Sequence, residues 1–368
     1  METGGVERAL ISMLKHFDYD EVEIDLYVQF LGGELYEELP KEVHTYQLET
    51  VSIKNAYKHP AFAIRKAFLL KQLKKNIPFE EQCYLSSKIL LPTKTQYDIA
   101  ISYHAPNTVP MFFVIDRIIA KKKILWLHGD LHDNKGEKKI VKEYHEKYDW
   151  FYAVSSNVRD GFVKLHPNKV NKINVFPNFV DEASIKNKAN TGKQFIDDGF
   201  FSILTIGRLD KQKGIDLAIK ACSYLVTDGY KIKWYVCGDG SERENLEILI
   251  KESGLVNSFF LLGNQNNPYG YLKSCDLYVQ PSRSEGCCLS TLEARLLNKV
   301  VITTDTSAKE QFVNNETGFV VQINDYSIYQ KIKSLLEHQE ELKRIRTNLQ
   351  CIDFLEANHI GVEDIYRE

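Results

Sequence analysis

Short apolar segments alternate with longer helical segments along almost the whole chain of 368 residues. The apolar segments are rich in β-branched and aromatic residues and are apolar on both faces, which is typical of parallel strands covered by helices on both sides. This alternation predicts the α/β class, with doubly wound parallel sheets. The strand candidates lie at residues 24–30, 99–103, 124–127, 150–154, 174–176, 202–206, 233–237, 258–262, 277–280 and 300–303.

The length of the chain predicts two domains, because single hydrophobic cores stop growing below this size. Residues 179–198 are polar and lack hydrophobic periodicity, so we expect them to form a linker. This places an N-terminal domain at 1–178 and a C-terminal domain at 199–345. We expect the C-terminal segment 346–368 to be helical and to pack back on the N-terminal domain.

Composition excludes several classes of protein. A net charge of −3 gives no reason to expect a nucleic-acid partner. The seven cysteines are scattered and form no Cys-x-x-Cys pair, which favours a reducing compartment and argues against disulfides and structural zinc. We find neither a signal peptide nor an apolar run of about 18–20 residues, so we expect a cytoplasmic protein.

The first motif is Gly-Arg-Leu-Asp-Lys-Gln-Lys-Gly at 207–214, directly after the strand candidate 202–206. Gly207 ends this strand, so Arg208 is expected at its carboxyl edge and Lys213 in the following loop. These two cations can neutralise a diphosphate, Arg by paired hydrogen bonds and Lys as a point charge. Taken alone, the motif fits two solvated surface cations better, but a second motif reverses that preference.

The second motif lies at 281–294, after the strand candidate 277–280. Glu285 precedes a helix expected to start near residue 289, and a carboxylate there can accept hydrogen bonds from two sugar hydroxyls. Gly286 allows close approach of the backbone, and the amides near Cys288 and Leu289 can face a phosphate at the helix N-terminus. For Glu293 the spacing leaves two roles open, because Ser-Thr-Leu-Glu at 290–293 also fits a capping box.

The two motifs, Gly-Arg-Leu-x-x-x-Lys-Gly and Glu-Gly-x-x-Leu-x-x-x-Glu, resemble those of the retaining nucleotide-sugar glycosyltransferases of family 4. The resemblance implies the GT-B fold, in which two Rossmann-like domains face a cleft. It also implies that Arg208 and Lys213 hold the diphosphate of the sugar donor, that Glu285 contacts the sugar, and that Glu293 binds the ribose. Further segments in the order of this family are found at 4–8, 127–130, 153–156, 176–181 and 237–240.

Two features of the N-terminal half also match the family. His128 stands at the end of the strand candidate 124–127, and its match implies a role near the sugar or the acceptor, although a lone histidine is more often structural. The Gly4–Gly5 turn opens a helix and offers amides to a phosphate or an acceptor, but it also fits a plain helix start. A turn of this kind normally follows a strand, so we expect that the first strand of this domain is missing upstream of residue 1.

A basic segment without acidic residues runs from Thr50 to Phe79. Its part at 54–75 interleaves aromatic and aliphatic residues with cations, which suits the surface of an anionic membrane on its cytoplasmic side. An ordinary solvated helix face or a site for a phosphate-rich acceptor would explain the same pattern. The cations are Lys54, Lys58, Arg65, Lys66, Lys71, Lys74 and Lys75.

The resemblance implies transfer of a sugar from a nucleoside diphosphate to a glycan or lipid-linked acceptor, with retention at the anomeric carbon. Because Arg208 and Lys213 supply the positive charge, we expect neither a metal nor another cofactor. A nicotinamide dehydrogenase is excluded, since no Gly-x-Gly-x-x-Gly follows an early strand. Two alternatives stay open on sequence alone, namely a nucleotide-sugar epimerase of the same architecture and an inactive subunit that binds an active homologue.

Overall fold

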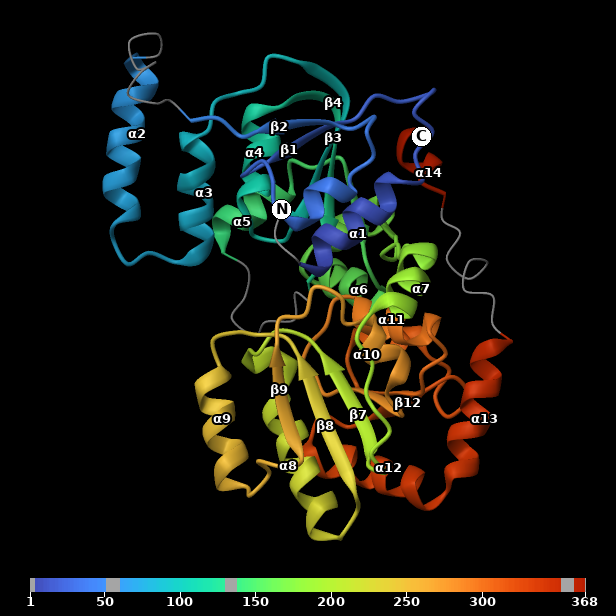
Figure 1. Cartoon of the computed structure of the whole chain (residues 1–368). Coiled ribbons are helices and arrows are strands. Elements are labelled where there is room, and N and C mark those ends of the chain that lie inside the picture. The colour runs from blue at the N-terminus through green and yellow to red at the C-terminus, as the bar shows by residue number, and fades with distance from the viewer. Residues whose placement is uncertain (1–3, 51–59, 130–137, 352–360, 368) are drawn as a thin grey trace. The chain divides into compact units, whose positions relative to one another are not determined.

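The computed structural model describes residues 4–50, 60–129, 138–351 and 361–367. The chain divides into two compact units, Met1–Phe179 with Ile360–Glu368, and Val180–His359 (Figure 1). Each unit is built from parallel strands and helices, which confirms the predicted α/β class. We describe each unit by itself.

The second unit contains a six-stranded parallel sheet in the order β12-β11-β10-β7-β8-β9. The chain enters at β7 in the middle of the sheet, runs outward to β9, returns to β10 beside β7, and then runs outward to β12. The order of the strands therefore reverses between β7 and β10, and ligands of open α/β sheets bind at such a point. The strands are β7 (Phe201–Ile206), β8 (Ile232–Cys237), β9 (Phe259–Gly263), β10 (Leu277–Gln280), β11 (Val301–Thr304) and β12 (Phe319–Val321).

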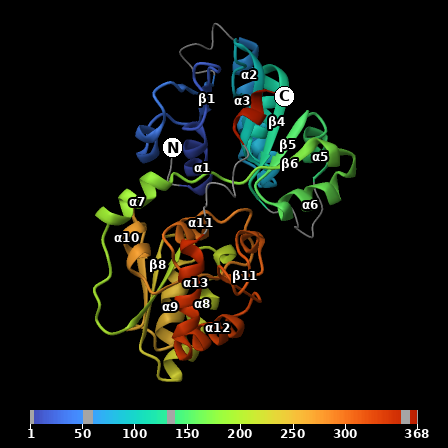
Figure 2. The ribbon, with the colours of Figure 1, turned by 90° about the vertical axis from the view of Figure 1, so that its right-hand side faces the viewer.

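Helices cover both faces of this sheet, because successive strand residues point to opposite sides. Ile203 and Val279 join one core with helices α8, α9, α12 and α13, and Leu204 and Tyr278 join a second core with α7, α10 and α11 (Figures 1 and 2). This arrangement confirms the doubly wound sheet that the sequence predicted. The helices are α7 (Glu182–Thr191), α8 (Ile215–Thr227), α9 (Arg243–Glu252), α10 (Tyr269–Ser274), α11 (Leu289–Leu296), α12 (Asp325–Glu337) and α13 (Gln339–Gln350).

The stretch at 179–198, expected to be a linker, contains helix α7. Asp181 caps this helix by accepting a hydrogen bond from the amide of Ser184 at 2.9 Å. Ile185 and Ala189 lie one turn apart and are both buried in the core on the side of α10. A polar sequence therefore forms a helix here because one cap and two apolar contacts are sufficient to dock it.

The first unit contains a four-stranded parallel sheet in the order β3-β4-β5-β6 and a separate parallel pair, β1-β2. Helix α1 is the first element among the described residues, and the leading strand stays a prediction. The C-terminal helix α14 also belongs to this unit, where Tyr366 stacks on Phe17 and Arg367 pairs with Glu21 at 2.9 Å. The strands are β1 (Asp25–Val28), β2 (His44–Gln47), β3 (Gln96–Ala105), β4 (Ile119–Leu127), β5 (Trp150–Ala153) and β6 (Ile173–Val175).

The remaining elements of the first unit cover this sheet or flank it. Helix α2 packs on α3 through a small apolar cluster centred on Leu69, Leu85 and Ile89. The helices are α1 (Gly5–Leu14), α2 (Pro60–Leu73), α3 (Phe79–Ile89), α4 (Val109–Arg117), α5 (Lys139–His145), α6 (Ser156–Leu165) and α14 (Glu363–Tyr366), with 3-10 turns η1 (Glu34–Glu38) and η3 (Pro167–Lys172).

Candidate functional site

Both sequence motifs follow the two central strands of the second unit. The loop 207–214 leaves β7 and the loop 281–288 leaves β10, and these strands pair in parallel with Tyr278 opposite Leu204. The two loops therefore emerge side by side at the same edge of the sheet, at the point where the strand order reverses. We regard this pair of loops as the candidate site.

The first loop is shaped by a local cap and by one glycine. Asp210 accepts a hydrogen bond from the amide of Lys213 at 3.0 Å and so closes the 3-10 turn η4 (Lys211–Lys213). Gly214 follows with φ of +65°, and a Cβ atom there would lie 2.1 Å from the carbonyl oxygen of Pro281. Only glycine allows the two loops to approach this closely.

Lys213 and Glu285 form an ion pair that joins the two loops. The Nζ atom of Lys213 donates to Oε1 and Oε2 of Glu285 at 2.8 and 2.9 Å. Their side chains are 17% and 6% exposed, so water screens the pair weakly. Burial is the largest single influence and lowers the pKa of Lys213, but Glu285, Cys288 and Asp210 together raise it by more, so the pKa lies above its ordinary value. Lys213 is therefore a fixed cation at physiological pH.

A second link holds the same loops together at their outer side. Arg283 donates to both carboxylate oxygens of Asp216 at 2.7 and 2.6 Å and to the carbonyl of Lys211 at 2.9 Å. The Nε2 atom of Gln212 donates to the carbonyl of Ser284 at 3.0 Å. These contacts position the backbone segments that carry Lys213 and Glu285.

Helix α11 begins directly after the second loop. Cys288 is its N-cap residue and Leu289 its first residue, and Cys288 makes no side-chain cap. The first amides of the helix therefore have no partner from an N-cap side chain, and they carry the positive end of the helix dipole. Gly286 is buried in the loop just before this helix end.

Glu293 lies one turn into α11, and its carboxylate faces the core of the second unit rather than solvent. It is 4% exposed, and Tyr269 of α10 donates to its Oε1 at 2.8 Å. Ser290 does not occupy the N-cap, and its hydroxyl donates to Gln280 at 3.2 Å. The capping box, one of the two roles left open by the sequence, therefore lacks its first member.

The two predicted cations differ in their placement. Lys213 contacts Glu285, whereas Arg208 is 74% exposed and lies 3.2 Å from the carboxylate of Asp210. Gly207 lies beside Lys213, since a Cβ atom there would come within 3.5 Å of the lysine Cδ. The structure thus brings Lys213 and Glu285 together and leaves Arg208 at the surface.

The other predicted residues belong to the first unit. His128 follows β4 directly, its ring lies 4.6 Å from that of Tyr103, and burial lowers its pKa to about 3. The imidazole is therefore neutral at physiological pH and can exchange hydrogen bonds without adding charge. Gly4 is the N-cap residue of α1 and Gly5 its first residue, again without a side-chain cap.

The sequence interpretation missed the buried polar residues behind Glu285. Ser282 donates to Oε1 of Glu285 at 2.6 Å, and Gln280 donates to Ser282 at 2.9 Å. Tyr278 in turn donates to Gln280 at 2.6 Å. The available signal was the alternation of these three polar residues along the end of β10 and into the loop that follows it.

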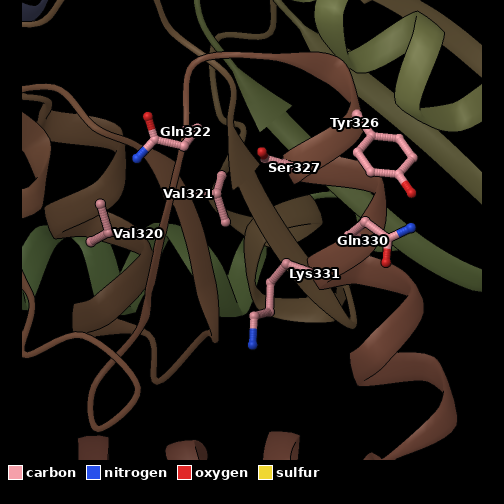
Figure 3. A pocket seen from close by; sticks show the side chains of 7 residues that line it. All are labelled: Val320, Val321, Gln322, Tyr326, Ser327, Gln330 and Lys331. Carbon is pink, nitrogen blue, oxygen red and sulfur yellow. The ribbon is translucent and has the colours of Figure 1, made fainter.

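We also searched the described residues for a metal site, a membrane-spanning helix and a hollow outside the two loops. Histidine, cysteine, aspartate and glutamate form no cluster of three or more in the described part of the chain that could hold a metal ion. Within the described ranges, no helix is both long enough and apolar enough to cross a bilayer. A shallow hollow over β12 and the start of α12 (Figure 3) contains no residue of the two loops, and its lining is Val320, Val321, Gln322, Tyr326, Ser327, Gln330 and Lys331.

Two family profiles match consecutive parts of the chain. The profile described as Glycosyltransferase Family 4 matches residues 3–184, and the profile described as Glycosyl transferases group 1 matches residues 186–350. The boundary between the two matches lies next to the boundary between the two structural units.

Two characterised relatives are similar over part of the chain. One is the N-acetylgalactosamine-N,N'-diacetylbacillosaminyl-diphospho-undecaprenol 4-alpha-N-acetylgalactosaminyltransferase of Campylobacter jejuni, 36% identical over 149 residues, with 40% of each chain covered. Another is the capsular polysaccharide biosynthesis glycosyltransferase CapM of Staphylococcus aureus, 30% identical over 240 residues, with 58% of this chain and 60% of CapM covered. The matches thus span about half the length of these relatives.

Solved structures of the same fold cover nearly the whole chain. HepE of Anabaena in complex with UDP and glucose aligns with a TM-score of 0.69 at 18% identity, covering 98% of this chain and 96% of HepE. WaaG, a glycosyltransferase involved in lipopolysaccharide biosynthesis, aligns with a TM-score of 0.63 at 14% identity, covering 99% and 97%. At these identities the likeness shows the shared fold.

Proposed function

Because this chain belongs to glycosyltransferase family 4, with the GT-B fold, we propose that it transfers a sugar from a nucleoside diphosphate to a glycan or lipid-linked acceptor. The two characterised relatives act in the synthesis of an undecaprenol-linked sugar and of a capsular polysaccharide, which supports a role in bacterial surface-polysaccharide assembly. The complex of HepE with UDP and glucose supports a UDP-sugar as the donor.

The observation that carries this proposal is the contact between Lys213 and Glu285 beside the N-terminus of α11. Cleavage of the bond between the anomeric carbon and the diphosphate builds negative charge on the leaving group. Lys213 and the first amides of α11 would stabilise that charge without reorganisation, which is usually the largest contribution to catalysis. Arg208 is exposed and can swing from Asp210 to the same diphosphate.

Glu285 is suited to bind the sugar rather than to attack it. Its carboxylate is held by Lys213 and Ser282, so its charge is already compensated and its position is fixed. We therefore assign retention to a front-face reaction. The bond from the anomeric carbon to the leaving phosphate breaks, the bond to the acceptor oxygen forms on the same face, and the acceptor proton passes to the departing phosphate. Glu293 would bind the ribose hydroxyls, and His128 would lie near the sugar or the acceptor.

The test is a panel of UDP-glucose, UDP-galactose and UDP-N-acetylglucosamine, scored by the rise in unfolding temperature. A ligand at 100 times its Kd stabilises the folded state by about 2.7 kcal/mol, which is readily detected. We expect one UDP-sugar to protect the protein, and we expect transfer from it to retain the anomeric configuration by NMR and to continue in EDTA. Absence of protection by UDP and by every UDP-sugar would contradict the proposal.

The same assay separates the two alternatives. An epimerase would convert the UDP-sugar to its epimer without an acceptor, and an inactive subunit would bind it without turnover. The named relatives are transferases, so neither alternative is favoured.

We also propose that the acceptor side works at the surface of an anionic membrane, and helix α2 supports this proposal. Ile64 and Phe68 lie one turn apart on this helix and are 74% and 61% exposed. Leu69, on the other side of α2, is buried against α3. Lys71 in the last turn of α2 and Lys75 just beyond its end are also exposed. Such a combination of apolar and basic side chains suits a bilayer with anionic headgroups. The other part of the predicted segment, 54–59, lies outside the described residues.

Flotation with vesicles tests this assignment. Wild-type protein should float with phosphatidylglycerol vesicles and not with phosphatidylcholine vesicles, and Ile64→Ser/Phe68→Ser should remove most of the binding. Ile248 of α9 is 54% exposed, so Ile248→Ser is a matched control that should bind like the wild type. Equal flotation of the double variant and the wild type would exclude α2 as the contact surface.

A further inference from the structure

A chain of buried hydrogen bonds lies behind the carboxylate of Glu285. Tyr278, Gln280 and Ser282 alternate along β10 and its continuation, so they share one face of the strand. All three are fully buried. Tyr278 and Gln280 belong to β10, and Ser282 follows two residues after Gln280 at the start of the loop that leaves this strand, so the sheet sets where the chain of hydrogen bonds begins.

The direction of these hydrogen bonds is fixed by the Glu285 carboxylate, which can only accept, so the Ser282 hydroxyl donates to Glu285 and accepts from Gln280. The Oε1 atom of Gln280 accepts from Tyr278 at 2.6 Å and from Ser290 at 3.2 Å. The Nε2 atom of Gln280 must then face the other way, and it donates to Ser282 at 2.9 Å and to Glu285 at 3.4 Å. Ser282 uses its own hydrogen for the bond to Glu285 at 2.6 Å. Each hydrogen bond in this chain therefore points toward Glu285.

The two carboxylate oxygens of Glu285 consequently differ. Oε1 accepts from Lys213, Ser282 and Gln280, whereas Oε2 accepts from Lys213 alone among the described residues. A carboxylate oxygen can accept about two hydrogen bonds, so Oε1 is saturated and Oε2 has capacity left. Oε2 is thus the oxygen that can receive a sugar hydroxyl.

We propose that Gln280 and Ser282 are positioning residues that hold Glu285 with Oε2 turned to the sugar of the bound nucleotide. This inference rests on the proposed function and adds that different residues bind the sugar and the diphosphate of the donor. Lys213 would serve the diphosphate, and the chain from Tyr278 to Ser282 would serve sugar recognition through Glu285. Loss of this chain should therefore weaken binding of a UDP-sugar more than binding of UDP.

The experiment compares Ser282→Ala and Ser282→Thr, with Ser223→Ala as control. Ser223 lies on α8 outside both loops, and its hydroxyl donates to the carbonyl of Lys220 within the same helix at 2.7 Å. For each variant we would measure Kd for UDP and for the best UDP-sugar of the panel by calorimetry, and kcat and KM for transfer. We expect Ser282→Ala to keep Kd for UDP within about twofold, to weaken the UDP-sugar about tenfold and to lower kcat about tenfold. Ser282→Thr keeps the hydroxyl and should restore most of both values.

Gln280→Glu gives an independent readout, because it places a second carboxylate against Glu285. Two adjacent carboxylates share a proton, so transfer by this variant should increase as the pH falls from 8 to 6, while the wild type should not show this increase. A merely structural role for Gln280 would not change the pH profile in this way.

The outcomes separate this inference from the proposed function. If the wild type binds and transfers but Ser282→Ala has wild-type Kd and kcat values, the positioning role is wrong and the proposed function stands. If Ser282→Ala loses UDP and the UDP-sugar to the same extent, the chain is structural and the inference is also overturned. If the wild type binds no UDP-sugar at all, both fail together.

Discussion

The pair Lys213–Glu285 should be strongly coupled, and a double-mutant cycle measures that coupling. The perturbations are Lys213→Met, Glu285→Gln and the double variant. In Glu285→Gln, an ammonium that is 17% exposed loses its counterion. In Lys213→Met, a carboxylate that is 6% exposed keeps only Ser282 and Gln280 as partners. Breaking one side of a buried pair costs about 3–5 kcal/mol, and the residual exposure of Lys213 favours the lower end.

We therefore expect each single variant to lower the free energy of unfolding of the second unit by about 3 kcal/mol. The double variant leaves no unpaired charge, so its loss in free energy of unfolding should be no larger than that of either single variant. This corresponds to a coupling energy of about 3 kcal/mol between the two residues. The surface pair Lys309–Asp305, with side chains 51% and 42% exposed, is the matched control, and its coupling should be at most about 1 kcal/mol.

Hydrogen exchange of peptides from β7 and β8 at increasing urea reports on the second unit separately from the first. The two variants that lack Lys213 should also bind UDP more weakly than the wild type, because the phosphate contact is gone. If the losses in free energy of unfolding caused by Lys213→Met and Glu285→Gln simply add in the double variant, the two residues do not neutralise one another. The ion pair would then not be the core of the site.

Three further predictions concern other parts of the structure. Gly214→Ala should lower the free energy of unfolding by about 2 kcal/mol or more and weaken UDP binding, because the added Cβ would meet Pro281 at positive φ. Thermal unfolding with and without UDP measures both effects, and unchanged values would contradict the close approach of the loops. Tyr269→Phe removes the hydrogen bond to Glu293 and should raise the Kd for UDP about fivefold. For a UDP analogue without the 2'-hydroxyl, the same substitution should raise the Kd by a smaller factor, and an equal rise for both ligands would argue against a ribose contact. Because the pKa of His128 is lowered to about 3, the unfolded state binds more protons than the folded state between about pH 6.5 and pH 3. The free energy of unfolding of the first unit should therefore fall by up to about 1.4 kcal/mol per pH unit as the pH is lowered through this range. In His128→Asn, the urea midpoint of unfolding should depend less on pH over the same range.

Most of the fold was predictable from sequence because buried parallel strands consist of runs of β-branched and aromatic residues. The ten strand candidates correspond to strands of the structure, and two further strands in the described part of the chain were missed. β2 is His-Thr-Tyr-Gln and is largely exposed, and β12 has only three residues, so neither produces an apolar run. Such strands at sheet edges are decided by pairing with a neighbour, which sequence patterns do not contain.

The site was predictable in its backbone and less so in its side chains. The loops after β7 and β10 lie together because both strands are central and parallel, and the contact of Lys213 with Glu285 follows from that. The exposed position of Arg208 beside Asp210 was not predictable, since it depends on a local choice between two partners. The hydrogen bonds of Gln280 depend on residues that come together only when β10 packs against α11.

The most direct test of the account is the Kd of UDP and of uridine for wild type and Lys213→Ala, measured by calorimetry at equal ionic strength. If Lys213 holds the diphosphate, the variant should bind UDP at least about tenfold more weakly, while its affinity for uridine should change little. Equal weakening of both ligands, or none for UDP, would contradict the assignment of Lys213 to the diphosphate.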